Sequence, residues 1–171
     1  MSVWGRLTYG DPCRECGFQW PLTLDDAVFI VGSIPDDVAV ALAGRDPASH
    51  HPDLTWSALA YVCHITDNLR IWAERLVGPG LGSTRPVSPY DGDLLARARS
   101  YEGVPIEGAM WSLARAVEDW KAAIRLAVER DVVLQHPERG PQTTRDVALT
   151  NAHDAYHHVW DIRRSMESAA R

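Results

Sequence analysis

The sequence predicts an all-α protein, a four-helix bundle preceded by an irregular N-terminal arm. Four long segments repeat apolar residues at helical spacing, and no segment shows the sustained alternation of a β-strand. The chain has 171 residues, which suits one domain with a full core and is short for two. We therefore expect an arm over residues 1–22, which carries a CxxC motif, and one helical bundle domain over residues 23–171.

The bundle helices are delimited by capping and breaking signals. Thr23 is expected to cap the first helix, whose first turn holds two aspartates. Pro35 is expected to break this helix, because proline lacks the amide donor of a helix interior, and the second piece should end at Gly44. The segment HPERGPQT is expected to be a loop before the last helix. The other helices are predicted over about 55–77, over about 93–101, from about 105, and from 143 or 144 almost to the C-terminus.

Composition and charge restrict the class of partner. The net charge is -6, which argues against a nucleic-acid binder because such affinity depends on clustered Lys and Arg. No apolar run approaches the length of a membrane span, and the first residues lack the basic flank and apolar core of a signal peptide. We therefore expect a cytoplasmic protein that binds neither nucleic acid nor membrane, and a homodimer is compatible with this sequence.

The most informative segment is NAHDAYHHVWDIRR, at residues 151–164, because it places His153 and His157 four residues apart on a predicted helix. Side chains at this spacing lie on one helix face, roughly 6 Å apart between Cβ atoms. Two such imidazoles can bind one metal ion when a facing helix supplies a third ligand. The alternative interpretation makes His153 a buried histidine bonded to a carbonyl and His157 a residue at the solvent edge.

Periodicity alone does not decide which residues of this helix face inward. Asp154 and His158 have the same spacing as the histidine pair. One of the two apolar stripes of the helix passes through His153, which favours an inward position for His153 and leaves His157 and His158 open.

Three segments together resemble the DinB-like superfamily, which includes the S-transferases that use mycothiol or bacillithiol and the mycothiol-dependent maleylpyruvate isomerases. WSALAYVCHITDNLRIW, at residues 56–72, is similar to the second helix of that family, with His64 in the position of a metal ligand. NAHDAYHHVWDIRR is similar to its fourth helix, and CRECGF, at residues 13–18, is similar to one branch of the family. The resemblance covers most of the chain and rests on a few short motifs.

The resemblance implies a divalent metal held by His64, His153 and His157, and it selects His157 over His158. Zinc is the expected ion, with nickel or iron also suited to nitrogen ligands. Three imidazoles leave a coordination position open, where a low-molecular-weight thiol co-substrate could ionise and attack. The expected function is a metal-dependent thiol S-transferase that acts on a small electrophile. The alternatives are a non-catalytic metal-binding or stress-response protein on the same scaffold and an interaction bundle without metal.

Two further features are candidates for chemistry, and each has competing interpretations. Cys13 and Cys16 could form half of a second metal site, with His50 and His51 as the other ligands, or a redox pair, or an incidental pair. Asp67 lies one helical turn after His64 and could orient that ligand or act as a general base. Its alternative is an ion pair with a neighbouring arginine on a solvated face.

Overall fold

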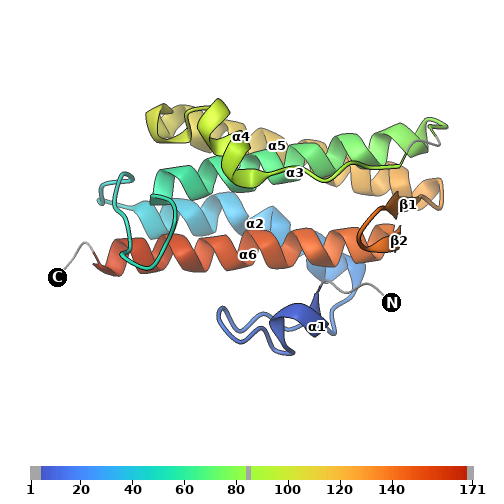
Figure 1. The fold of residues 1–171 in the computed structure, drawn as a ribbon, viewed down its shortest axis with the longest axis horizontal. Coiled ribbons are helices and arrows are strands. Elements are labelled where there is room, and N and C mark those ends of the chain that lie inside the picture. The colour runs from blue at the N-terminus through green and yellow to red at the C-terminus, as the bar shows by residue number, and fades with distance from the viewer. Residues whose placement is uncertain (1–4, 84–85, 169–171) are drawn as a thin grey trace.

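Two pairs of long helices make up the bundle, with the N-terminal arm lying along one side of it (Figure 1). The computed structural model describes residues 5–83 and 86–168. Helix α3 packs against α5 and α6, and α2 packs against α6 and α5. The elements are α1 (Arg6–Tyr9), α2 (Leu24–Leu42), α3 (Ala58–Gly80), α4 (Gly92–Ala98), the 3-10 turn η1 (Tyr101–Gly103), α5 (Ile106–Glu129), β1 (Val133–His136), β2 (Gly140–Thr143) and α6 (Thr144–Ser168). The all-α bundle that the sequence predicts is confirmed.

Helix α2 begins where predicted but does not break at Pro35. Thr23 and Asp26 form a reciprocal capping box, in which the Thr23 hydroxyl accepts from the Asp26 amide and the Asp26 carboxylate accepts from the Thr23 amide. The helix continues through Pro35 to Leu42, so the predicted break is wrong. Ile34 and the buried residues one turn on either side form one apolar stripe against the core, and this packing outweighs the lost backbone hydrogen bond.

A short β-hairpin stands where a loop was expected before the last helix. Strands β1 and β2 pair antiparallel, with Leu134 opposite Gln142 and both side chains buried. Gly140 has a φ of 70°, a left-handed conformation that glycine adopts without strain as the chain enters β2. Strands of four residues show too few alternations of apolar and polar residues to be predicted. Residues of this hairpin line the two cavities described below.

The core lies between the four long helices. Trp120 of α5 is fully buried, and its indole nitrogen donates a 2.9 Å hydrogen bond to the side-chain oxygen of Asn151 on α6. This bond fixes α6 against α5 at the start of the histidine segment. Within the part of the chain that the structure describes, the helices are too short or too polar to cross a bilayer.

Candidate metal centres

Helix α6 carries two ligand pairs that are offset from each other by one residue. His153 and His157 form one pair, and Asp154 and His158 form the other. Successive residues of an α-helix are rotated by about 100°, so the two pairs face different directions. Each pair meets a different part of the molecule, and each is completed there by further potential ligands.

The second pair meets α3 and forms a group that we call the open group: His64, Asp154 and His158. Its ligand atoms all lie within 4.8 Å of one another. Nε2 of His64 is 3.9 Å from Oδ2 of Asp154, and Nε2 of His158 is 3.8 Å from Oδ1 of the same carboxylate. The two imidazole rings are perpendicular, with centroids 4.8 Å apart. Two nitrogen donors and one oxygen donor therefore converge on one point between α3 and α6.

Hydrogen bonds from residues outside the open group orient Asp154 and His158, the two members of the group that lie on α6. Nδ1 of His158 lies 2.9 Å from Oδ2 of the buried Asp161. The Asn68 amide donates a 2.6 Å hydrogen bond to Asp154, and the Tyr90 hydroxyl donates a 2.9 Å bond to Asn68. A carboxylate on the far nitrogen of a histidine fixes its tautomer and directs the other nitrogen toward a metal. Asp161 and Asn68 thus hold His158 and Asp154 in place, as the neighbours of metal ligands do.

Burial and charge act in opposite senses on the two histidines of the open group. Burial lowers the pKa of His64 to about 4, so this imidazole is neutral near neutral pH and its nitrogen lone pair is free to ligate. Burial alone would also lower the pKa of His158, but its hydrogen bond to Asp161 and the charge of Asp154 outweigh burial and raise that pKa.

The open group lies at the edge of a cavity of about 240 Å³ between α3, α6 and the hairpin, and both His64 and Asp154 line it. Arg75 of α3 and Arg139 of the hairpin also line this cavity, and their guanidinium groups lie 4.5 Å and 5.4 Å from the ring centroid of Trp72. Cation–π contact on one indole holds both positive charges beside the open group. A small molecule in this cavity would meet two donor-rich cations together with His64 and Asp154 of the open group.

The first α6 pair meets the N-terminal arm and forms a group that we call the arm group: Cys13, Cys16, His153 and His157. Its four ligand atoms all lie within 4.8 Å of one another. Sγ of Cys13 is 4.0 Å from Nδ1 of His157, while Nε2 of that ring faces the carboxylates of Glu15, at 3.6 Å, and Asp161, at 3.8 Å. Two sulfur and two nitrogen donors therefore converge.

The CRECGF segment folds into a closed turn that presents both sulfurs. The Cys13 amide donates to the Phe18 carbonyl at 2.9 Å, and the Gly17 amide donates to the Cys13 carbonyl at 3.0 Å. Gly17 has a φ of 76°, which allows the chain to reverse directly after Cys16. Burial raises the pKa of Cys16 to about 12.

Aromatic side chains of the arm surround His153. The ring centroids of Tyr9, Trp20 and Phe18 lie 4.5 Å, 4.6 Å and 5.2 Å from that of His153. Burial lowers the pKa of His153 to about 4. Its Nε2 is buried and has no hydrogen-bond partner among the described residues. The arm is thus packed onto α6 around an imidazole whose polar atom is unsatisfied.

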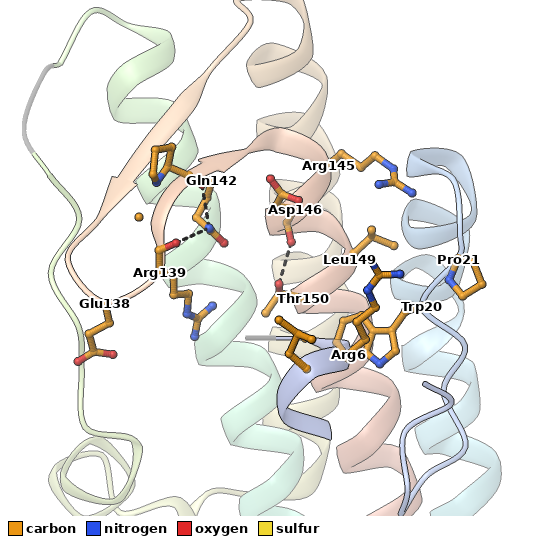
Figure 2. Close-up of a pocket in the computed structure, with 14 residues that line it drawn as sticks. Arg6, Trp20, Pro21, Glu138, Arg139, Gln142, Arg145, Asp146, Leu149 and Thr150 are labelled. Atoms are coloured by element: carbon orange, nitrogen blue, oxygen red, sulfur yellow. Dashed lines mark hydrogen bonds between the residues drawn. The ribbon is translucent and has the colours of Figure 1, made fainter. Parts of the chain in front are cut away.

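A larger cavity, of about 940 Å³, separates the arm from the hairpin. Figure 2 shows Arg6 and Trp20 of the arm on one side and Arg139 on the hairpin side. Glu138, Arg139 and Thr150 line both this cavity and the smaller one beside the open group. The two cavities therefore adjoin at these residues, and the arm forms an outer wall of the space that leads to the open group.

The structure groups the predicted ligands in a different combination from the one expected. His64 lies with Asp154 and His158, whereas His153 and His157 lie with the two arm cysteines. His158, which the resemblance passed over in favour of His157, lies beside His64, with ring centroids 4.8 Å apart. The two pairs have the same spacing, so periodicity does not choose between them, and the resemblance selected His157. In the structure it is His158 that lies beside His64, because α3 packs against that side of α6.

The structure does not place His50 and His51 beside the two cysteines, and it does not place Asp67 in the open group. His51 accepts a hydrogen bond from the Asp53 amide within its own loop, and the arm group contains neither His50 nor His51. Asp67 accepts hydrogen bonds from Tyr101, at 2.6 Å, and from Arg99. It lines a separate small cavity with these partners, so it ties α3 to the α4–η1 segment.

Sequence reasoning did not single out Asp154 as a candidate ligand or Asp161 as the hydrogen-bond partner of His158. The i,i+4 relation between Asp154 and His158 was visible, but a carboxylate on a helix is most often a solvated surface group. Asp161 carries a clearer signal, because an acid three residues after His158 can bond its ring on the same helix face.

The fold and the site together define a class of protein. It is a four-helix bundle whose histidine-rich last helix supplies two candidate metal-ligand groups. The family model of the DinB superfamily matches residues 34–162. The chain belongs to the DinB superfamily. No curated protein matches the sequence.

Comparison with solved structures finds similarity over most of the chain. A similar structure is that of YfiT from Bacillus subtilis, described as a probable metal-dependent hydrolase with an unusual four-helix bundle topology. The two share 16% sequence identity with a TM-score of 0.75, over 86% of this chain and 87% of the other. At this identity the likeness establishes the four-helix bundle fold.

Proposed function

We propose that this protein is a metal-dependent enzyme that acts on a small anionic molecule, with the metal ion held by His64, Asp154 and His158. The observation that carries the proposal is the 2.9 Å contact between Nδ1 of His158 and the buried Asp161. When Nδ1–H of His158 donates to Asp161, the lone pair of the ring stands on Nε2, the atom that faces Asp154.

The donor set of the open group fits a divalent transition metal. Two imidazoles and one carboxylate are ligands of catalytic zinc and of non-heme iron, and nickel also accepts them. The group has three protein donors, so substrate or solvent can complete the coordination from the cavity of about 240 Å³. With one carboxylate, a divalent ion would leave about one net positive charge, which favours an anion beside it.

The cavity residues supply binding and orientation. A bound divalent ion would lower the pKa of a thiol or a water molecule until its anion is available near neutral pH. Arg75 and Arg139 would hold a carboxylate or phosphate of the substrate, because their guanidinium groups are fixed on Trp72. Asn68, held by Tyr90, keeps Asp154 in its ligating orientation.

Within this class, we favour thiol S-transfer with a low-molecular-weight thiol as co-substrate. The thiol sulfur would attack a small electrophile, form a carbon–sulfur bond, release the leaving group and lose its proton to solvent. Support comes from the resemblance of the helix motifs to thiol-dependent members of the superfamily and from the two cavity arginines, which suit a thiol that carries carboxylates. Zinc is the ion that we favour, and a cytoplasmic location agrees with such a co-substrate.

Hydrolysis is the second candidate reaction. YfiT, a similar solved structure, is described as a probable metal-dependent hydrolase. In this chain the carboxylate of Glu138 lines the same cavity and could accept a proton from water. Glu138 lies in the turn between β1 and β2 and is exposed, so solvent can take up the proton that it accepts.

The two reactions and the non-catalytic alternative can be separated in one set of assays. Protein without a tag is loaded with zinc, nickel or iron and offered a generic electrophile with a panel of small anionic thiols, and separately a panel of activated esters and amides. Thiol-dependent turnover supports S-transfer, and thiol-independent hydrolysis supports the second candidate. Loss of turnover in His158→Ala, with activity retained in the exposed-loop control His50→Ala, assigns it to the open group. Absence of both activities in metal-loaded protein would contradict an enzyme and leave a metal-binding protein.

A further inference from the structure

The arm group is a separate candidate site, independent of the proposed enzyme function. We propose that Cys13, Cys16, His153 and His157 form a closed structural zinc site that fixes the N-terminal arm onto α6. Four protein donors of this kind are the ligand set of structural zinc, which leaves no position for a substrate. The open group differs, because it has three donors and a cavity.

The distances in the arm group suit one tetrahedral ion. Zinc–sulfur bonds of about 2.3 Å and zinc–nitrogen bonds of about 2.0 Å place tetrahedral ligand atoms about 3.3–3.8 Å apart. Sγ of Cys13 and Nδ1 of His157 are 4.0 Å apart, and all four ligand atoms lie within 4.8 Å of one another. Small movements of the side chains would complete the coordination.

The surroundings of His153 and His157 favour a bound metal ion over simple packing of the two rings in the core. Nε2 of His153 is buried with no hydrogen-bond partner in the described chain, and an unsatisfied buried nitrogen is costly unless something binds it. His157 presents Nδ1 to the sulfur and Nε2 to the carboxylates of Glu15 and Asp161. Carboxylates behind a ligating imidazole are the outer partners that metal sites use.

The charge and the chain geometry also agree with zinc. Each thiol would lose one proton to solvent on binding, so two thiolates balance a divalent ion and the half-buried site becomes neutral. The CRECG turn is closed by its own backbone hydrogen bonds and reverses at Gly17. The spacing of Cys13 and Cys16 in this turn is that of a zinc knuckle, whose other half the chain takes from α6.

Cobalt is the probe that tests the site, because cobalt bound by thiolates absorbs in the near ultraviolet by charge transfer and cobalt bound by nitrogen and oxygen alone does not. Apo-protein without a tag is titrated with cobalt and then with zinc. We expect thiolate charge-transfer absorption in the wild type and its loss when zinc displaces cobalt. Cys13→Ser with Cys16→Ser should abolish this absorption, and the buried α3 cysteine provides the matched control, Cys63→Ala, which should keep it.

The same titration separates this site from the proposed enzyme. His158→Ala removes a ligand of the open group and should keep the thiolate absorption, whereas His153→Ala should lose it. Retention in His158→Ala therefore supports the arm site even if no catalytic activity is detected. Absence of thiolate absorption in the wild type, or its persistence in the double serine variant, would overturn the proposal, as would its loss in the double variant His50→Ala with His51→Ala.

Proteolysis provides a second readout that does not depend on a variant folding. Arg14 lies exposed between the two cysteines, so trypsin cleavage after Arg14 reports opening of the turn. Zinc should slow this cleavage of the wild-type apo-protein about tenfold or more, because the bound ion opposes opening. Cleavage after Arg45, in an exposed loop away from the arm, serves as the internal control and should not change. Equal cleavage after Arg14 with and without zinc would contradict the proposal.

Discussion

The open group and the arm group stand one residue apart on the same helix, yet their surroundings predict different chemistry. The open group joins α6 to a neighbouring long helix, has three donors and adjoins a cavity. The arm group joins α6 to an irregular segment, has four donors including two sulfurs, and is packed among aromatic rings. Helix spacing supplies both ligand pairs, and the partner segment decides whether a site is open for a substrate or closed.

The largest expected effect separates the groups by activity. His158→Ala removes a ligand of the open group and should lower kcat/KM of the metal-loaded enzyme by about 1,000-fold, since a divalent ion is held weakly by two donors. His157→Ala, one residue away, leaves the open group intact and should retain activity within about tenfold. The measurement is steady-state turnover of both variants. A greater loss in His157→Ala than in His158→Ala would reverse the assignment of the two groups.

Acid should destabilise the apo-protein through His64 and His153, one histidine of each group, whereas the raised pKa of His158 acts in the opposite sense. Burial lowers the pKa of His64 and of His153 to about 4 in the folded state, against about 6.5 for an ordinary histidine. Between these values the unfolded chain binds more protons, so stability is present above pH 6.5 and falls as the pH drops toward 4. Each histidine should contribute a loss of about 3 kcal/mol.

Urea unfolding with a chelator, at intervals from pH 7 to pH 4, measures this loss. Replacing His153 by Phe, which suits the aromatic surroundings, should remove the contribution of the arm group and leave that of His64. An unfolding free energy of the wild type that is constant across this pH range would contradict the burial of both neutral rings.

Zinc bound at the arm group should raise the free energy of unfolding, by somewhat less than the loss expected from each histidine in acid. At free zinc about 100-fold above its Kd, linkage predicts about 2.7 kcal/mol of added stability per site. Cys13→Ser with Cys16→Ser should lose the contribution of the arm group only, while Cys63→Ala should respond to zinc as the wild type does. Thermal unfolding with and without zinc provides the comparison. An undiminished response of the double variant would place all of the zinc stabilisation outside the arm.

The smallest expected effect concerns Tyr90 and Asn68, which hold Asp154 of the open group in place through hydrogen bonds. Tyr90→Phe removes the 2.9 Å hydrogen bond to Asn68, which in turn orients Asp154. Loss of such an outer partner should weaken metal affinity at the open group by about tenfold and leave the thiolate–cobalt absorption of the arm group unchanged. Titration with cobalt reports both sites in one sample. Equal weakening at both sites would indicate a general loosening of the fold.

Much of the fold could be predicted from the sequence because it depends on local patterns. Apolar spacing and capping residues such as Thr23 define the long helices. Pro35 was misleading because tertiary packing on both sides of it overrides a local backbone preference. The β1–β2 hairpin was missed because its strands are short and one of its buried side chains, Gln142, is polar.

The candidate site could be predicted only in part. Spacing identified two ligand pairs on one helix, but choosing the pair that meets His64 requires the rotation of α6 against α3. The pairing of Cys13 and Cys16 with α6 joins residues about 140 positions apart. Nothing in the local pattern encodes such a contact, so only the folded structure shows that the two cysteines lie with His153 and His157.

Asp161 gives the two groups a shared support. Its Oδ2 lies 2.9 Å from Nδ1 of His158 and 3.8 Å from Nε2 of His157, so one carboxylate stands behind a ring of each group. An ion that draws the His157 ring toward the arm ligands would change its electrostatic contact with Asp161, and Asp161 is the carboxylate that accepts the hydrogen bond of His158. Coupling of this kind is reciprocal. A metal ion bound in the arm group would therefore change the affinity of the open group for its own metal ion, which makes the arm an allosteric input to the open group.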